Sequence, residues 1–204
     1  MSAEIGRLPD SASTLSSTAA EMLRRMSRRW RNRILIAVAI TLIGFLGLTA
    51  RYFVWPRLPV VPAHVDAIVE LGGPGDDDRD RLAIELAKAH RADYLVQSTV
   101  QSDADSGRCL PAEPGVTVLC FHPDPNTTRG EARAIGRLAR QYGWHSVVLV
   151  TTADHAWRAR LRVTRCFPGQ VYVATSHLPP LYWFRQIPYQ WAASGKAEFV
   201  QTNC

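Results

Sequence analysis

Short apolar runs alternate with segments of helical periodicity over most of the chain. The runs with the length and composition of strands cover residues 66–71, 94–100, 116–121, 146–151 and 171–174. The segments with apolar positions three or four residues apart cover residues 79–92, 128–142 and 154–165. Nearly continuous apolar strands separated by helices predict a mostly parallel sheet that is covered on both faces. The expected fold class is therefore α/β, a doubly wound, Rossmann-like sheet.

A longer apolar run precedes the alternating part. No charged residue occurs over residues 34–50, a length close to the ~17 residues of the shortest membrane-spanning helices. Trp30 before the run, and Tyr52 and Trp55 after it, match the aromatic belts of membrane interfaces. A buried core helix and a cleaved signal peptide are the alternatives, but the run is longer than a usual signal core and no small-x-small pair ends it. We therefore expect one N-terminal transmembrane helix over residues 34–55.

The positive charge of the chain lies mainly before this helix. The net charge is +6, and residues 1–33 alone carry seven arginines against three acidic residues. The domain itself is nearly neutral, which argues against a nucleic-acid partner. Because basic residues favour the cytoplasmic side, we expect a disordered cytoplasmic tail over residues 1–33 and an extracytoplasmic domain over residues 64–204. The proline-rich residues 56–63 are expected to form a stiff linker that lifts the domain off the bilayer.

Four cysteines follow the apolar run, and they are Cys109, Cys120, Cys166 and Cys204. An even number of cysteines outside the cytoplasm is typical of disulfides, and four cysteines allow three pairings. The favoured pairing joins Cys109 to Cys120 and Cys166 to Cys204, which would tie the aromatic tail (residues 179–204) to the domain. That tail is expected to pack a helix or loop over the sheet. Zinc is the alternative, but the usual ligand spacings do not occur, and we expect no metal.

Polar loops follow three of the predicted strands, and in a parallel sheet such loops meet at one edge. The first loop contains Gly72 and Gly73, whose small size permits a close approach of backbone to a ligand such as phosphate. It matches neither the Gly-x-Gly-x-x-Gly pattern nor a Walker loop. The three aspartates at residues 76–78 could hold a divalent cation. The favoured interpretation is a solvated loop in which Asp78 caps the next helix.

The second loop leads into the helix that is predicted to begin at Thr128. Thr128 and Glu131 have the spacing of a capping box, in which each side chain satisfies a backbone N–H at the helix start. Asn126, Thr127 and Arg129 could in addition present hydrogen-bond donors and the positive end of the helix dipole to an anion. The sequence leaves both interpretations open.

The third loop follows Thr151 and Thr152 and opens a helix that carries His155 and Arg158. The helix dipole is expected to lower the pKa of His155 and keep its imidazole neutral, as suits an acid–base group. His155 and Arg158 are one turn apart on one face and could bind an anionic oxygen together. Alternatively, His155 caps its helix while Arg158 pairs with Asp154.

Over residues 66–174 the chain resembles the bacterial YdcF-like family, which includes SanA and ElyC. The resemblance rests on three blocks, residues 66–73 (DAIVELGG), 126–132 (NTTRGEA) and 149–159 (LVTTADHAWRA). They are similar in order and spacing to the family's DAIVVLGG, NTxENA and VTSxxHxxRA. Ser98 lies where the family carries Ser-Gly-Gly after its second strand, without the two glycines. The resemblance implies a role in the bacterial cell envelope, in barrier function or in handling cell-wall and lipid-carrier intermediates.

These observations predict a membrane-anchored protein that binds a small anionic, phosphate-bearing envelope metabolite. The candidate ligand-binding residues are Gly72, Gly73, Ser98, Asn126, Thr127, Thr128, Glu131, Thr151, Thr152, His155 and Arg158. His155 is also the candidate acid–base residue. The alternative function is a non-catalytic accessory protein that uses the fold as a scaffold for envelope partners. One cytoplasmic family member is associated with S-adenosylmethionine, which we do not expect here, and no other cofactor follows from the sequence.

Overall fold

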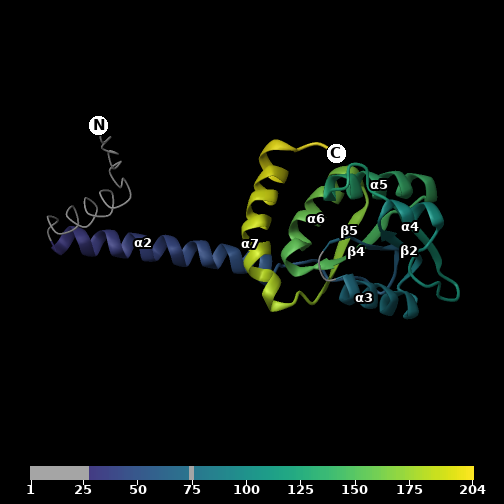
Figure 1. Ribbon diagram of the computed structural model, residues 1–204, viewed down its shortest axis with the longest axis horizontal. Helices are drawn as coiled ribbons and strands as arrows, with labels where there is room; N and C mark the ends of the chain where they lie inside the picture. Colours follow the sequence, from purple (N-terminus) through teal and green to yellow (C-terminus); the bar gives the residue numbers. More distant parts are fainter. Residues whose placement is uncertain (1–27, 74–75) are drawn as a thin grey trace, which may run out of the picture. The chain divides into compact units, whose positions relative to one another are not determined.

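The computed structural model describes residues 28–73 and 76–204, and residues 48–204 form one compact unit (Figure 1). Helix α2 covers Arg28–Thr49 and continues into a π-helical turn, η1, over Ala50–Val54. By length and composition, the segment Arg28–Val54 is able to cross a membrane. Residues 28–33, which we expected in the disordered tail, are helical, because nothing in this arginine-rich stretch breaks a helix. The remainder of that tail, residues 1–27, lies outside the described residues.

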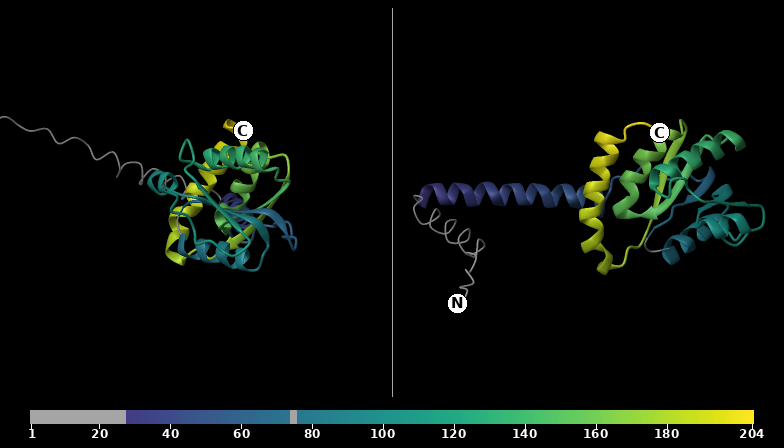
Figure 2. Two further views of the ribbon diagram at one scale, coloured as in Figure 1. Left: turned by 90° about the vertical axis from the view of Figure 1, so that its right-hand side faces the viewer. Right: turned by 45° about the horizontal axis from the view of Figure 1, so that its top comes forward.

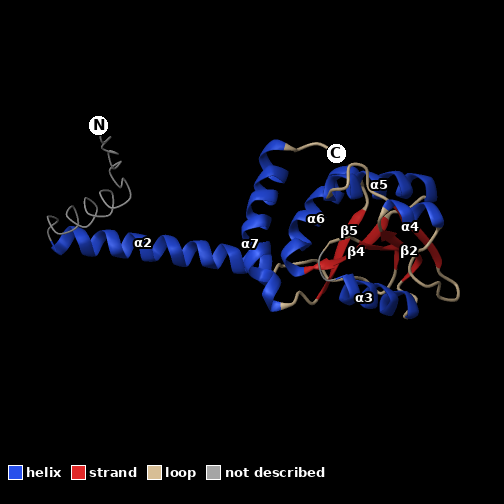
Figure 3. Cartoon of the chain, in the orientation of Figure 1, coloured by secondary structure: helices blue, strands red, loops and turns tan. Residues whose placement is uncertain are grey.

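The sheet has five parallel strands in the order β3-β2-β1-β4-β5, which confirms the doubly wound α/β prediction. Figure 3 shows the strands in red with the helices around them in blue. The strands are β1 (Val65–Glu70), β2 (Ala92–Ser98), β3 (Thr117–Phe121), β4 (Ser146–Thr152) and β5 (Gln170–Ser176). The chain winds outward from β1 to β3 and then returns to the other side of β1 at β4. A crevice is therefore expected where β1 and β4 end, at the point where the strand order reverses.

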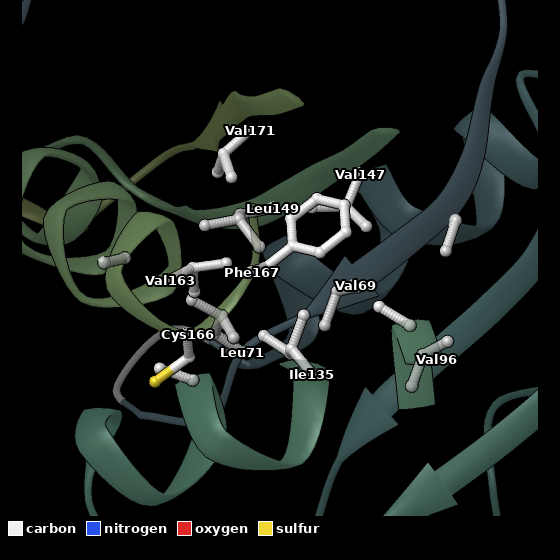
Figure 4. Packing of buried hydrophobic residues seen from close by; sticks show 14 of the residues in the cluster. Val69, Leu71, Val96, Ile135, Val147, Leu149, Val163, Cys166, Phe167 and Val171 are labelled. Carbon is white, nitrogen blue, oxygen red and sulfur yellow. The ribbon is translucent and has the colours of Figure 1, made fainter. Parts of the chain in front are cut away.

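Helices cover both faces of the sheet. Helix α3 (Asp76–Lys88) packs on one face, while α5 (Thr128–Tyr142) and α6 (Ala153–Cys166) lie together over the other. Strand β4 contributes to both cores, because successive side chains point to opposite faces: Val147 and Leu149 pack with the α5 and α6 residues, and Val148 and Val150 with those of α3. Figure 4 shows the first core around Leu149, with Ile135 and Val163 from the two helices. A short helix, α4 (Gln101–Ser106), lies between β2 and β3.

Both predicted disulfides are confirmed. Cys109 joins Cys120 with a Cα–Cα distance of 5.5 Å, and Cys166 joins Cys204 with a Cα–Cα distance of 4.9 Å. The second bond ties the chain end to the last residue of α6. The C-terminal tail forms helix α7 (Pro180–Gly195) and a π-helical turn, η2 (Lys196–Val200). It packs against α6 and not over the sheet as expected, because α6 already covers that face (Figure 2).

The end of the predicted transmembrane helix packs on the domain, and so does the proline-rich segment, residues 56–63, that we expected to hold the domain away from the bilayer. Phe53 is 1% exposed, and its ring meets that of Trp191 edge to face at 5.3 Å between centroids. Trp191 Nε1 also donates a hydrogen bond of 3.1 Å to Thr49 Oγ1. Further along, Leu58 and Val61 pack against the two hydrophobic cores. Burial of these apolar side chains outweighs the preference of a proline-rich segment for an extended, solvated path.

Candidate functional site

A polar cavity of about 660 Å³ lies at the carboxyl edge of the sheet, where the strand order reverses. This volume is typical of small-molecule sites. Ten of the eleven sequence-predicted ligand residues line it, and they are Gly72, Gly73, Ser98, Asn126, Thr127, Thr128, Glu131, Thr152, His155 and Arg158. The eleventh, Thr151, is fully buried behind the cavity and contacts His155. The three loops therefore converge as predicted.

Glu131 does not form the capping box that its spacing predicted. The helix cap of α5 is Thr127, whose Oγ1 accepts the Gly130 N–H at 3.3 Å. Glu131 points away from its own helix start, and its Oε1 accepts the Gly72 N–H at 2.9 Å. Burial raises the pKa of this carboxyl, although hydrogen bonds from Gly72 and Ser98 favour the ionised form. A tertiary contact therefore replaces the local one, and it joins the β1 loop to α5.

His155 lies between two threonine hydroxyls. Its Nδ1 is 3.0 Å from Thr151 Oγ1, and its Nε2 is 3.2 Å from Thr128 Oγ1. Thr128 Oγ1 in turn accepts a hydrogen bond of 2.8 Å from Arg158 Nη1. The Thr128 hydroxyl therefore lies between the guanidinium and the imidazole, and each ring nitrogen of His155 faces one hydroxyl. A half-buried hydroxyl that faces the cavity is thus polarised between a cation and a neutral base, as proton transfer requires.

Burial also sets the protonation state of His155. Desolvation lowers its pKa well below the ordinary 6.5, and the nearby charges of Arg158 and Arg79 lower it further. The helix dipole was the expected cause of the lowered pKa of His155, whereas burial is the largest cause in the structure. The neutral imidazole is able to accept a proton at neutral pH.

Arg158 and Asp154 are joined through a third residue. Arg158 Nε donates to Gln190 Oε1 at 3.0 Å, and Gln190 Nε2 donates to Asp154 Oδ2 at 2.8 Å. The direct Arg158–Asp154 pair that we considered from the sequence is therefore replaced by a bridge from α7. The Arg158 guanidinium also lies 5.5 Å from the centre of the Tyr189 ring. Three contacts from two helices, α5 and α7, thus hold this buried cation at the cavity wall.

A second buried arginine lies beside the β1 loop. Arg79 is 1% exposed, donates through Nη2 to the Gly73 carbonyl, and approaches Glu70 with an Nε–Oε1 distance of 3.7 Å. Gly73 has φ +131°, a conformation that favours glycine, and a side chain there would meet Arg79. The β1 loop is therefore shaped around a buried ion pair.

Sequence reasoning missed several residues of the cavity wall. They are Glu70, Arg79, Asp80, Gln97, Thr99, Arg185, Gln186, Tyr189 and Gln190. A signal did exist for Glu70, a single charge within an otherwise apolar strand after Asp66. No local signal pointed to Gln190, because its role depends on where α7 docks. With these residues the wall carries three arginines and four carboxylates, so it is polar with both signs of charge.

One of the three aspartates of the first loop, Asp78, pairs with an arginine. Asp78 lies inside the first turn of α3 and not at its cap, because the helix begins at Asp76, and its Oδ1 accepts from Arg81 at 2.7 Å. Across the described residues, no three His, Cys, Asp or Glu side chains are grouped to hold a metal ion.

The pH dependence of stability should separate the two buried titratable groups. Below pH 6.5, His155 is protonated in the unfolded chain but stays neutral in the folded protein. The free energy of unfolding therefore falls as pH falls. Glu131 has the opposite effect on stability. Because its pKa is raised in the fold, the folded protein binds a proton at this carboxyl above pH 4.5, where the unfolded chain does not, and the free energy of unfolding rises as pH falls. Each contributes up to about 1.4 kcal/mol per pH unit within its window.

Two variants test these signs by chemical denaturation between pH 7 and pH 5. His155→Gln should remove the loss of stability on acidification, whereas Glu131→Gln should make that loss steeper than in the wild type. Parallel curves for all three proteins would show that neither group is perturbed in the fold.

Comparison with known proteins adds no family to this geometry. No protein-family model matches the chain, and no curated protein is significantly similar to it. The likeness of the three blocks to the YdcF-like family therefore stays a prediction.

Proposed function

We propose that this protein is a membrane-anchored member of the bacterial YdcF-like family that binds a small, phosphate-bearing metabolite of the cell envelope in the cavity between β1 and β4. The observation that carries the proposal is Arg158, a buried guanidinium in the cavity wall that is hydrogen-bonded to Thr128 at the start of α5. A guanidinium and a helix N-terminus that face the same cavity are together suited to bind an anionic oxygen.

The carboxylates in the wall narrow the class of ligand. Asp154 is 1% exposed, and within the described residues its Oδ1 accepts no hydrogen bond. A buried oxygen without a donor costs about 1–3 kcal/mol, which a ligand hydroxyl that reached Asp154 would recover. Asp80 adds a further acceptor to the same wall. The proposed ligand thus combines an anionic group with hydroxyl donors, as a sugar phosphate does.

An extracytoplasmic position for the domain is part of this proposal. Two disulfides support it, because such bonds persist in oxidising compartments. The arginines before α2 also support it, since they favour a cytoplasmic N-terminus. Within the proposed site, Arg158 and the start of α5 hold the anion, and neutral His155 exchanges a proton with the Thr128 hydroxyl.

Ligand binding is tested with the full chain in detergent, because Phe53 and Leu58 are part of the folded unit and a fragment starting at residue 64 would lose them. Hexose phosphates, nucleotide sugars, polyprenyl phosphates and S-adenosylmethionine are screened for a rise in Tm, and the Kd of any positive compound is measured by calorimetry. We expect a phosphate-bearing compound to raise the Tm and Arg158→Met to weaken its binding about tenfold or more.

Two further variants make the result specific. Arg185→Met removes an exposed cation of the cavity wall and should weaken binding without affecting folding. Arg137→Met removes an exposed arginine on α5 outside the cavity and should change nothing. If no phosphate-bearing compound raises the Tm, or if Arg158→Met and Arg185→Met both bind like the wild type, the proposal fails. An envelope phenotype that survives both variants would instead favour the scaffold function.

A further inference from the structure

Exposed apolar side chains of the folded unit gather around α7. Within the described residues after η1, Val100 and Tyr142 are the only large, exposed apolar side chains outside Trp55, Val60 and residues 181–200. Leu181 and Phe184 on α7 are 82% and 84% exposed. The residues at successive three- and four-residue steps after them are also small or apolar, namely Pro188, Ala192 and Gly195. Since positions three and four apart share a helix face, these five residues form one stripe, the α7 stripe.

The side of α7 opposite this stripe is polar and buried. Gln190 is 2% exposed within its bridge to Arg158 and Asp154, and Ser194 is also buried. The helix thus turns Gln190 and Ser194 into the protein and the apolar stripe outward. A soluble helix normally shows the reverse arrangement. Arg185 and Lys196 are exposed beside the stripe, which is typical of helices that lie in the interface of a membrane.

Trp191 joins the region of the α7 stripe to the end of α2. Trp191 lies beside the stripe, donates to Thr49 and packs on Phe53. Thr49 is the last residue of α2 and lies near the end of the segment Arg28–Val54 that is able to span a membrane, and Trp55, which is 74% exposed, follows that segment directly. Exposed arginines at Arg51 and Arg57 add positive charge to the same region. The stripe, the tryptophan and the basic residues are therefore continuous with the point where the chain leaves the bilayer.

We propose that α7 is an interfacial helix whose stripe, Leu181, Phe184, Pro188, Ala192 and Gly195, rests on an anionic lipid surface. This inference rests on the proposed membrane anchoring by α2. Lipid accounts for both observations, because the acyl boundary takes the apolar stripe and the anionic headgroups take Arg185 and Lys196. Since α7 also contributes Arg185, Tyr189 and Gln190 to the cavity, the cavity lies within one helix diameter, about 10 Å, of the lipid surface.

Photocrosslinking in vesicles tests this contact on the full chain. The variant Phe184→p-benzoylphenylalanine is reconstituted in vesicles of phosphatidylethanolamine and phosphatidylglycerol, irradiated and analysed by mass spectrometry. We expect a lipid adduct at this position. The control Tyr142→p-benzoylphenylalanine carries the probe on an exposed ring of α5, far along the chain from the stripe, and should give none. A covalent dimer at position 184, or no adduct there, would overturn the inference.

A second variant tests whether the stripe itself holds the helix on the lipid. Leu181→Glu with Phe184→Glu should abolish the lipid adduct of a probe placed by Ala192→p-benzoylphenylalanine. Its Tm in detergent should equal that of the wild type, because both replaced side chains are exposed. An undiminished adduct would contradict the proposed contact. Flotation of the vesicles separates the two proposals: a chain that does not float defeats the anchoring, whereas a floating chain without an adduct at 184 defeats only the interfacial helix.

Discussion

The double variant Cys166→Ser, Cys204→Ser is expected to lose about 4 kcal/mol of unfolding free energy, since the bond closes a long loop in the unfolded chain. The two cysteines are 38 residues apart in sequence. The bond also holds the chain end against α5, where Arg129 and Arg133 each donate to the Cys204 oxygen at 3.1 Å. Without the disulfide, the last residues are held by hydrogen bonds alone, and α7 keeps only its packing and the hydrogen bonds of Gln190 and Trp191.

The measurement is urea denaturation of the full chain in detergent, followed by tryptophan fluorescence. The matched control is Cys109→Ser, Cys120→Ser, which opens a loop with a separation of 11 residues. This control should lose about 3 kcal/mol, less than the first variant, because a shorter loop restricts the unfolded chain less. If the C-terminal bond proves the weaker of the two, loop closure does not explain its contribution.

The variant Gly130→Ala is expected to destabilise the protein by about 3 kcal/mol, at the upper end for one added methyl group in a packed site. A Cβ at this position would overlap the Pro125 carbonyl oxygen and lie 3.0 Å from the Asp124 carbonyl carbon. The Pro125 carbonyl cannot move aside freely, because its oxygen accepts the Thr127 N–H at 2.7 Å. The start of α5 must shift instead, and Thr128 and Glu131 shift with it.

Gly195→Ala is the matched control for this variant. Gly195 has helical φ and ψ of −59° and −44°, and a Cβ there meets no atom within 4 Å. Alanine should stabilise the chain at this position by about 0.5–1 kcal/mol, because it restricts the unfolded backbone. Thermal unfolding of both variants, with ligand affinity measured alongside, checks the pair. Equal behaviour of Gly130→Ala and Gly195→Ala would contradict the tight contact at the start of α5.

The site was predictable as far as it depended on where strands end. Gly72, Thr128 and His155 each follow a strand, and parallel strands bring their carboxyl ends to one edge, so the convergence of their loops followed from the fold class. The partners of these residues were not predictable in the same way. Thr128 and Glu131 had the spacing of a capping box, yet Thr127 caps the helix and Glu131 bonds to Gly72. The buried Glu131 carboxylate accepts a hydrogen bond from whichever N–H lies beside it in the folded chain, and that donor, Gly72, is 59 residues away in sequence.

The segments on either side of the sheet domain show the same limit. Residues 56–63 were expected to be a spacer and residues 179–204 a cover for the sheet, but Leu58 packs against the core and α7 packs on α6. Neither segment has a periodic pattern of apolar residues that identifies the element on which it packs. Their positions depend on apolar surface left uncovered by other elements, which composition alone does not reveal.

Hydrophobic periodicity along the chain was sufficient for the order of strands and helices, the parallel sheet and the apolar helix before it, because each depends on residues close in sequence. The pairing of the cysteines was also favoured correctly from their spacing. The tertiary structure decided which groups meet in the cavity: the bridge of Gln190 between Arg158 and Asp154, the contact of Glu131 with Gly72, and the docking of Trp191 on Thr49. Each is a contact between residues far apart in sequence, where burial selects a partner that local preference does not specify.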